Sequence, residues 1–286
     1  MIYFLTVNYY STYLVNKLIN SIQANNNTSY KIVIINNSLE DDSIYLLKSK
    51  SVLILEAGSN IGFGRACNLG LDWIYAQDAQ AIVWLINPDT FIVKSASDKV
   101  NSFFEAHPEL SIVGTIIYTP DNQIWFAGGK FIAARGAILN KNTCIDSDAE
   151  YILCDWVSGC SLLINLAKFP NCPQFDPIYF LYYEDFDFCK RYAAQNHLIA
   201  VTKKLSVIHS PSSITNKNIV VKIKHSTYSY LVTIERYTNK LVLIIRLVRL
   251  LIYAIILILV KPKVAFGKLY GVLLYLRRSL PFCHQS

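Results

Sequence analysis

The stretch from Ala81 to Thr90, AIVWLINPDT, constrains the fold more than any other part of the chain. Its first six residues are apolar without a break, which is typical of a strand buried on both faces of a sheet. Pro88 cannot donate to a strand ladder and favours an extended Asn87, so Asp89 should follow the carboxyl end of the strand. Ligands bind at that edge of an open α/β sheet, and a carboxylate there can hold a hard divalent cation. The alternative is a simple turn, because Asn, Pro and Asp each favour turns.

Strands and helices are predicted to alternate around this strand. Apolar runs at 2–7, 30–35 and 52–55 favour strands, and residues with helical spacing follow the first of them. Further strands are predicted at 112–118 and 201–208. Because strand, helix, strand order implies parallel pairing with crossovers, we expect an α/β domain with a mostly parallel sheet flanked by helices.

Charge divides the 286-residue chain into two parts. Residues 217–286 contain 12 Lys and Arg against one acid, Glu235, whereas residues 1–216 carry a net charge of −4. The length suits one large α/β domain with an appendage. We therefore predict a domain over 1–215 and a basic, apolar helical tail over 216–286.

Cysteine usage and the first residues favour a reduced, cytoplasmic protein. The seven cysteines are an odd number with neither a C-x-x-C pair nor zinc-like spacing. The start of the chain, 1–7, lacks the positive region of a signal peptide and favours a first strand. The cysteines are Cys67, Cys144, Cys154, Cys160, Cys172, Cys189 and Cys283.

A glycine-rich segment, 58–70, precedes a predicted helix. It has no third glycine at dinucleotide spacing and no acid at the proper distance, so we reject a dinucleotide fingerprint. Its glycines would still let backbone N–H groups approach a ligand. A tight loop without a ligand is the alternative.

A second acidic cluster lies in 175–191, where an aromatic run changes abruptly to Glu184 and Asp185. A carboxylate framed by aromatic side chains has raised basicity and can deprotonate a hydroxyl, which favours chemistry at Asp185. Helix capping and ion pairing are the simpler interpretations of Glu184 and Asp187.

Two smaller patterns add candidates. His209 directly follows the last predicted strand, where it could be a metal or phosphate ligand, although a lone histidine is usually structural. Ser158 and Gly159 are small residues before an apolar strand, so they could let an acceptor approach or merely pack tightly.

Taken together, these motifs resemble family-2 glycosyltransferases of the GT-A fold, particularly the bacterial rhamnosyltransferase-like branch. The resemblance covers about residues 2–215. It rests on an ordered series: Val7-Asn8-Tyr9, Asn36-Asn37-Ser38, Asn60-Ile61-Gly62-Phe63-Gly64 through Asn68, Asn87-Pro88-Asp89-Thr90, Val157-Ser158-Gly159, Phe180 to Asp187, and Val207-Ile208-His209.

The resemblance implies a Rossmann-like sheet and a set of roles for these residues. Asp185 would be the catalytic base, Asp89 and His209 would hold Mg²⁺ or Mn²⁺, and the reaction would invert the anomeric carbon. The nucleotide-sugar donor would be bound by Val7, Asn8, Tyr9, Asn36, Asn37, Asn60, Gly62, Phe63, Asn68 and Asn87. The acceptor side would comprise Trp156, Ser158, Gly159 and Glu184.

This sequence departs from the family pattern at two strand exits. Asn36 stands where relatives commonly have an aspartate that grips the base or ribose, and an amide adds no charge there. Asn87-Pro88-Asp89 supplies one acid where many relatives have two. Donor phosphates and water would then have to complete the metal shell.

The tail contains a 20-residue apolar stretch, 241–260, whose only charges are Arg246 and Arg249. Each arginine costs about 2.5–3.5 kcal/mol near the centre of a bilayer. We therefore expect an interfacial or re-entrant helix held by anionic lipid through Lys261, Lys263, Lys268, Arg277 and Arg278. A true span is the second interpretation and a buried core helix the third.

The resemblance thus implies a glycosyltransferase of cell-surface polysaccharide synthesis, and the basic tail predicts that it is peripheral to the inner face of the cytoplasmic membrane. Its partners would be a nucleotide-diphosphate sugar, with dTDP-rhamnose suggested by the branch, and a glycan or lipid-linked acceptor. No nucleic-acid recognition motif is present. The alternatives are a non-catalytic membrane-associated nucleotide-sugar-binding relative, and a nucleotidyltransferase, which would normally show a phosphate loop near the first strand.

Overall fold

A computed structural model describes residues 1–25, 29–93, 98–141, 148–210 and 218–279. Cys144, Cys283 and the predicted domain boundary at 215/216 lie outside the described residues. By internal contacts the chain forms two compact units. The sheet unit comprises Met1–Lys130, Leu139–Ile178 and Glu184–Ile214, and the helical unit comprises Phe131–Ile138, Tyr179–Tyr183 and Thr215–Ser286.

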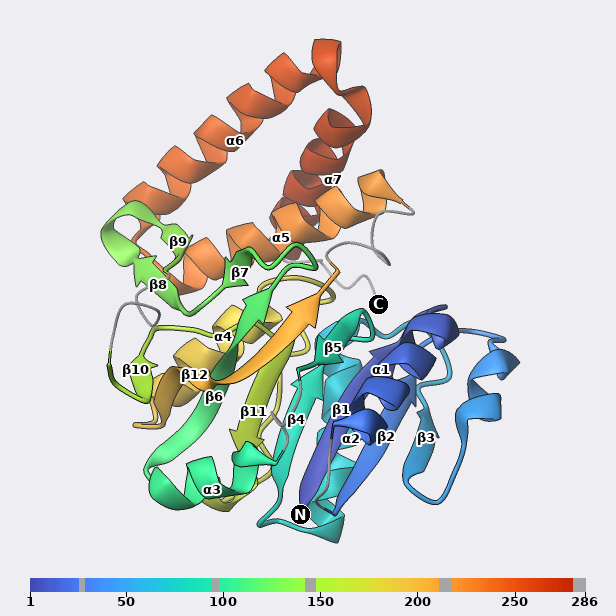
Figure 1. Cartoon of the computed structure of the whole chain (residues 1–286). Helices are drawn as coiled ribbons and strands as arrows, with labels where there is room; N and C mark the ends of the chain where they lie inside the picture. The colour runs from blue at the N-terminus through green and yellow to red at the C-terminus, as the bar shows by residue number, and fades with distance from the viewer. Residues whose placement is uncertain (26–28, 94–97, 142–147, 211–217, 280–286) are drawn as a thin grey trace, which may run out of the picture. The chain divides into compact units, whose positions relative to one another are not determined.

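Within the described residues, the sheet unit contains a mixed sheet with the path β10-β12-β6-β11-β4-β1-β2-β3 (Figure 1). β5 pairs with β12, and β7 pairs with β6. The strands on the path are β1 (Ile2–Asn8), β2 (Tyr30–Asn36), β3 (Val52–Glu56), β4 (Ile82–Ile86), β6 (Leu110–Tyr118), β10 (Tyr151–Leu153), β11 (Ser161–Asn165) and β12 (Leu198–His209); the side branches are β5 (Thr90–Ile92) and β7 (Ile124–Phe126).

The predicted α/β class, with a mostly parallel sheet flanked by helices, is confirmed. β4, β1, β2 and β3 pair in parallel, and β6 pairs in parallel with β12. β11 runs antiparallel to both β4 and β6. The core holds fully buried residues such as Phe4, Trp84 and Ile32, as expected for strands covered on both faces.

Helices cover both faces of the sheet. The chain passes from β1 to β2 in one direction and from β3 back to β4 in the other, so right-handed crossovers place α1 and α2 on opposite faces (Figure 1). The helices of this unit are α1 (Thr12–Ala24), α2 (Phe63–Gln77), α3 (Lys99–Ala106) and α4 (Glu184–Ala193). Short 3₁₀ helices are η1 (Asp42–Leu47) and η3 (Leu166–Lys168).

The remaining elements include the helices of the second unit. They are α5 (Ile219–Tyr237), α6 (Lys240–Val260) and α7 (Pro262–Ser279). A small ribbon of β8 (Gly129–Ile132) and β9 (Ala137–Asn140), with η2 (Ala133–Arg135) at its tip, lies between β7 and β10 in the chain. Two element boundaries matter for the site. β12 extends to include His209, and α4 begins at Glu184, so Asp185 lies in its first turn.

Candidate functional site

The register of the parallel strands brings three polar residues to one edge of the sheet. Asn8 pairs with Asn36, and Asn36 pairs with Glu56, so the last residues of β1, β2 and β3 lie side by side. The Asn8 amide donates to Asn36 Oδ1 at 3.0 Å, and the Asn36 amide donates to the Glu56 carboxylate at 3.0 and 3.2 Å. This chain of amides ends in a carboxylate at the edge.

Asn8 and Asn36 therefore face inward, although the sequence pattern predicted that they would contact the donor. Both are buried, and Asn8 Oδ1 also accepts from the backbone N–H and the hydroxyl of Ser11. The groups that remain accessible at this edge are two carboxylates that the sequence reasoning missed, Glu56 and Asp41. Their signal was present, since Glu56 directly follows the strand predicted at 52–55, and Asp41 lies in the polar segment after the strand predicted at 30–35.

Asp41 is held as a charged group. Burial raises the pKa of its carboxyl, but hydrogen bonds from Ser43, Asn8 and Thr12 outweigh that effect and lower the pKa overall. The Asn8 amide reaches Asp41 Oδ2 at 3.0 Å. The edge thus presents negative charge even though Asn36 itself carries none.

The neighbouring loop is organised by two asparagines predicted to bind the donor. Asn37 donates to Asn60 Oδ1 at 3.1 Å and accepts from the N–H of Ile61 at 2.9 Å. Asn60 in turn accepts from the N–H of Gly62, whose φ of 90° favours glycine. The loop therefore delivers the N-terminus of α2, starting at Phe63, in a fixed direction.

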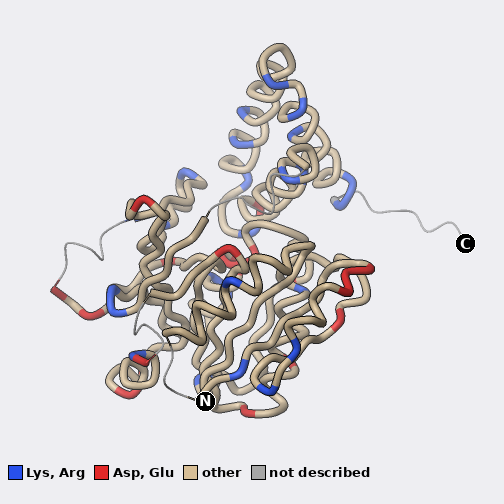
Figure 2. Tube along the Cα trace, turned by 45° about the vertical axis from the view of Figure 1, so that its right-hand side comes forward, with Lys and Arg blue, Asp and Glu red and all other residues tan. Residues whose placement is uncertain are grey.

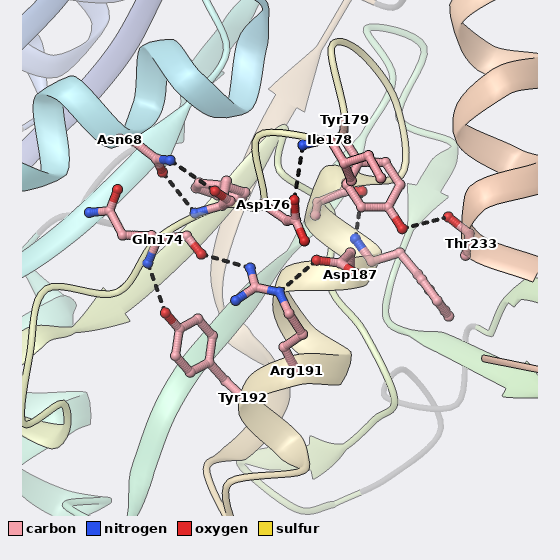
Figure 3. A network of polar contacts seen from close by, with 12 residues as sticks. Asn68, Gln174, Asp176, Ile178, Tyr179, Asp187, Arg191, Tyr192 and Thr233 are labelled. Carbon is pink, nitrogen blue, oxygen red and sulfur yellow. Dashed lines mark hydrogen bonds and ion pairs between the residues drawn. The ribbon is translucent and has the colours of Figure 1, made fainter. Parts of the chain in front are cut away.

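Three other predicted donor residues differ in their surroundings. Val7 is buried in β1, whereas Tyr9 is 41% exposed and lies beside Tyr10. Asn68 donates to the carbonyl of Phe175 at 2.8 Å and accepts from its N–H at 2.7 Å, so it braces α2 against the segment before α4 (Figure 3).

Asp89 and His209, the two predicted metal ligands, lie next to each other. His209 Nε2 lies 3.2 Å from Asp89 Oδ1, and both side chains are buried. The pairing of β12 with β5 places His209 opposite Thr90, and the N–H of Ser210 donates to the Asp89 carbonyl. The ring of Trp125 packs against the imidazole in a T-shaped arrangement, with 4.8 Å between the ring centroids.

These two residues fit a divalent cation as two of its ligands. Carboxylate oxygen and imidazole nitrogen are both ligands of Mn²⁺, and the buried Nδ1 of His209 has no hydrogen-bond partner among the described residues. No cluster of three or more His, Cys, Asp or Glu suited to a metal exists within the described ranges. The rest of a coordination shell would have to come from a ligand and water.

A short turn at 158–160 connects this pair to Asp185. The N–H of Gly159 donates to Asp185 Oδ2 at 2.8 Å, and the Cys160 thiol lies 3.3 Å from Thr90 Oγ1. The N–H of Asn87 donates to the Cys160 carbonyl at 3.0 Å. Burial raises the pKa of the Cys160 thiol, and the charges of both Asp89 and Asp185 add to this increase. Both acids thus lie near one thiol.

Asp185 combines partial exposure with an environment that favours proton uptake. Burial raises the pKa of its carboxyl, partly offset by the N–H groups of Gly159 and Phe186. The side chain of Phe63 lies 3.5 Å from the position a Cβ on Gly159 would take. The start of α2 and the start of α4 therefore meet at this turn.

Glu184 is a buried carboxyl beside Asp185. Burial and the charge of Asp185 raise the pKa of Glu184 to about 8, and its Oε2 has no hydrogen-bond partner among the described residues. Its Cβ lies 3.5 Å from the position that a Cβ on Gly64 of α2 would take. Among the residues that the structure describes, Glu184 thus forms no ion pair.

Asp187 has the structural role that we considered for it. Asp187 Oδ2 accepts from Arg191 Nε at 2.7 Å, and Arg191 also donates to the Gln174 carbonyl (Figure 3). Tyr192 accepts from the N–H of Gln174 at 2.8 Å. These contacts fix α4, and so Asp185, against the preceding segment.

Two acceptor-side candidates have internal contacts. Ser158 Oγ accepts from the N–H of Cys160 at 3.2 Å, which shapes the turn. Trp156 packs against Phe126 and Phe186, and its buried Nε1 has no hydrogen-bond partner within the described residues. The indole N–H is therefore a hydrogen-bond donor that an acceptor could use.

Comparison with known proteins supports the same interpretation of the fold. No protein-family model matches the chain. It is 23% identical over 211 residues to the N-acetylglucosaminyl-diphospho-decaprenol L-rhamnosyltransferase of Mycobacterium tuberculosis (strains CDC 1551 / Oshkosh and ATCC 25618 / H37Rv), and the match covers 66% of this chain and 69% of the relative.

Several solved structures share the architecture. GalNAc-T7 with UDP, GalNAc and Mn²⁺ has a TM-score of 0.59 at 12% sequence identity. The match covers 80% of this chain and 47% of the GalNAc-T7 chain. The Pyrobaculum calidifontis mannosyltransferase PcManGT with GDP-Man and Mn²⁺ has a TM-score of 0.58 at 10% sequence identity. The match covers 98% of this chain and 88% of the PcManGT chain. S. aureus TarS has a TM-score of 0.54 at 13% sequence identity, and the match covers 99% of this chain and 44% of the TarS chain. The chain thus spans just under half of the GalNAc-T7 and TarS chains. It has the GT-A glycosyltransferase fold and resembles the rhamnosyltransferase-like branch of family 2.

Proposed function

We propose that this protein is an inverting glycosyltransferase that moves a sugar from a nucleotide-diphosphate donor to a hydroxyl of a glycan or lipid-linked acceptor. The observation that carries the proposal is the turn at 158–160, which brings Asp185 and the Asp89–His209 pair to one side of the sheet. The likeness to a rhamnosyltransferase and to structures with bound nucleotide sugars supports it.

Asp185 is the proposed general base. Its carboxylate is oriented by the N–H groups of Gly159 and Phe186, each at 2.8 Å, and burial raises its pKa toward the range where it accepts a proton readily. The acceptor hydroxyl would lose its proton to this carboxylate as its oxygen attacks the anomeric carbon. Attack opposite the leaving nucleotide diphosphate inverts that carbon.

Asp89 and His209 are the proposed protein ligands of Mg²⁺ or Mn²⁺. When bound, such an ion supplies positive charge that stabilises the departing diphosphate. GalNAc-T7 and PcManGT, which share the fold, contain Mn²⁺. The chain's own contribution is to hold the two ligands rigidly through the β5–β12 pairing and the Trp125 ring.

The donor base is proposed to lie at the ends of β1, β2 and β3. There, the accessible carboxylates of Glu56 and Asp41 can accept hydrogen bonds, and the exposed ring of Tyr9 can stack on a base. A pyrimidine with an N3–H donor suits this edge. The branch resemblance favours dTDP-rhamnose as the sugar donor.

The acceptor proposal also sets the location. The similar M. tuberculosis protein is named for a substrate carried on decaprenyl diphosphate, which is a lipid. We therefore propose that this enzyme works in the cytoplasm at the inner face of the membrane. The five described cysteines are all free thiols, in keeping with a reducing compartment.

The direct test compares Asp185→Asn with Asp121→Asn, a change at an exposed surface turn. Radiolabelled sugar transfer by Asp185→Asn should fall about 10²–10⁴-fold, the usual contribution of a general base, while donor affinity measured with Mn²⁺ stays within twofold. Asp121→Asn should match the wild type.

Transfer by Asp185→Asn at a near wild-type rate would refute the base assignment. A wild-type protein that binds nucleotide sugars but transfers none would instead support the non-catalytic binding relative. The anomeric configuration of the product, read by NMR, tests inversion separately.

A further inference from the structure

α6 carries an exposed apolar stripe along its whole length. Residues spaced by three or four positions lie on one face, and their side chains are about half exposed or more, reaching 91% at Leu259. Only 17% of the most apolar window of this helix is buried. The stripe includes Leu241, Ile245, Val248, Ile252, Ile256 and Leu259.

α7 repeats the pattern on its own outer face. Phe266, Tyr270 and Leu273 are exposed, with Phe266 at 54%. The opposite face of α7 packs closely on α5, because a Cβ at Gly271 would lie 2.6 Å from the Lys224 carbonyl and one at Gly267 would lie 2.8 Å from Ile223. The packing that holds the helical unit together therefore leaves both stripes uncovered within it.

Basic residues are distributed along the helices that carry the apolar stripes (Figure 2). Lys261 is the single residue between α6 and α7, and Lys263 and Arg277 lie in the first and last turns of α7. Across 217–286 the net charge is +11. A second copy of the same surface would bring this charge against itself, whereas an anionic lipid headgroup layer would neutralise it.

The contacts of α6 favour a helix that lies along a bilayer rather than across it. Arg246 Nε donates to the carbonyl of Arg135 at 2.9 Å, so one charge within the apolar stretch is tied to the β8–β9 tip of the same unit. α7 returns alongside α6, and its Lys268 ammonium lies 5.5 Å from the Tyr253 ring. If α6 crossed the membrane, it would carry this ammonium into the hydrocarbon.

We propose that the paired stripes of α6 and α7 form a monotopic docking surface for an anionic lipid bilayer. Both helices would lie in the interfacial plane, and Lys261 would stay on the side of the bilayer from which the protein binds. The proposal specifies the membrane part of the proposed function and rests on that location, but it does not depend on the sugar-transfer reaction. Its apolar part enters the headgroup boundary while the basic residues remain at phosphate level.

The test uses the full chain with vesicles of three parts phosphatidylcholine and one part phosphatidylglycerol, and with pure phosphatidylcholine vesicles. The stripe variant is Ile252→Gln with Leu259→Gln. The control is Leu46→Gln with Leu153→Gln, which removes two exposed leucines from the sheet unit.

We expect the wild type and the control to co-sediment with the anionic vesicles, more weakly with pure phosphatidylcholine, and the stripe variant to bind at least tenfold more weakly. A wild type that stays in the supernatant with both vesicles refutes the proposal. The proposal is also refuted if sedimentation velocity without lipid shows that the wild type and the control are dimers and the stripe variant is not.

Orientation is tested with Lys261→Cys and a membrane-impermeant maleimide added outside the vesicles, with the modified residue identified by mass spectrometry. Modification of position 261 in vesicle-bound protein by the external reagent supports the interfacial plane. Complete protection of position 261 that detergent relieves means that α6 crosses the bilayer, and refutes it. Neither readout needs transferase activity, so failure here is distinct from failure of the proposed enzyme.

Discussion

Replacing Glu184 by glutamine should stabilise the protein in a pH-dependent way. Burial and the Asp185 charge raise the pKa of Glu184 to about 8 from 4.5, so the folded state binds this proton more tightly than the unfolded state does. Wild-type stability then falls as the pH rises from about 4.5 to about 8, by about 1.4 kcal/mol per pH unit for this group. Glutamine is uncharged throughout and removes that fall.

The expected gain of Glu184→Gln over the wild type is therefore about 3 kcal/mol at pH 7 and near zero at pH 4.5. Urea unfolding followed by circular dichroism at pH 5, 6, 7 and 8 measures it. The slope of the difference against pH is the decisive quantity, because any loss of packing by the amide shifts all points equally.

Asp187→Asn is the matched control, three residues further along the same helix. Asp187 is also buried but pairs with Arg191 at 2.7 Å, so its loss should destabilise by about 1.5–3 kcal/mol. Since Glu184 remains, the control should keep the wild-type pH dependence. A Glu184→Gln difference that is flat from pH 5 to 8 would refute the reasoning.

Two further predictions concern donor binding. Asp89→Ala should lower nucleotide-sugar affinity measured by calorimetry with Mn²⁺ at least tenfold, about 1.4 kcal/mol, and unchanged affinity would remove Asp89 from the site. Glu56→Gln keeps an oxygen for the Asn36 amide but removes the edge charge, so donor affinity should fall about tenfold while the maximal rate holds. An unchanged affinity would place the base elsewhere.

Local sequence patterns were sufficient to predict the strand exits. The unbroken apolar run before Asn87 and the proline after it determine where β4 ends, and the run before His209 does the same for β12. These signals need only neighbouring residues. The closeness of Asp89 to His209 then follows from sheet topology, since both lie near the end of a strand at the same edge.

The direction of the Asn36 side chain could not be predicted in this way. Its amide is oriented by Glu56, 20 residues away, and by Asn8, 28 residues away. A single sequence shows that Asn36 lacks a charge but not that Glu56 supplies one beside it. The helical unit is a similar case, because Phe131–Ile138 and Tyr179–Tyr183 join it from distant parts of the chain.

The segment that precedes α4, Tyr179–Tyr183, belongs to that helical unit. Within it, Ser229 donates to the Leu181 carbonyl at 2.9 Å and Thr233 to the Tyr179 hydroxyl at 3.3 Å, so α5 anchors the segment (Figure 3). Tyr182 and Tyr183 adopt left-handed φ values of 70° and 66°, at a cost of about 1–3 kcal/mol each.

Such strain persists where other contacts fix the chain, as the contacts with α5 do for this segment. After the strained pair, Gly159 accommodates Asp185 so closely that a Cβ there would lie 3.3 Å from the Asp185 Cβ. Gly159 itself is placed by the pairing of Ser161 with Ile86, the last residue of β4. The proposed base and the proposed metal ligand are therefore positioned by one strand pair, which is how acids 96 residues apart would serve the proposed reaction.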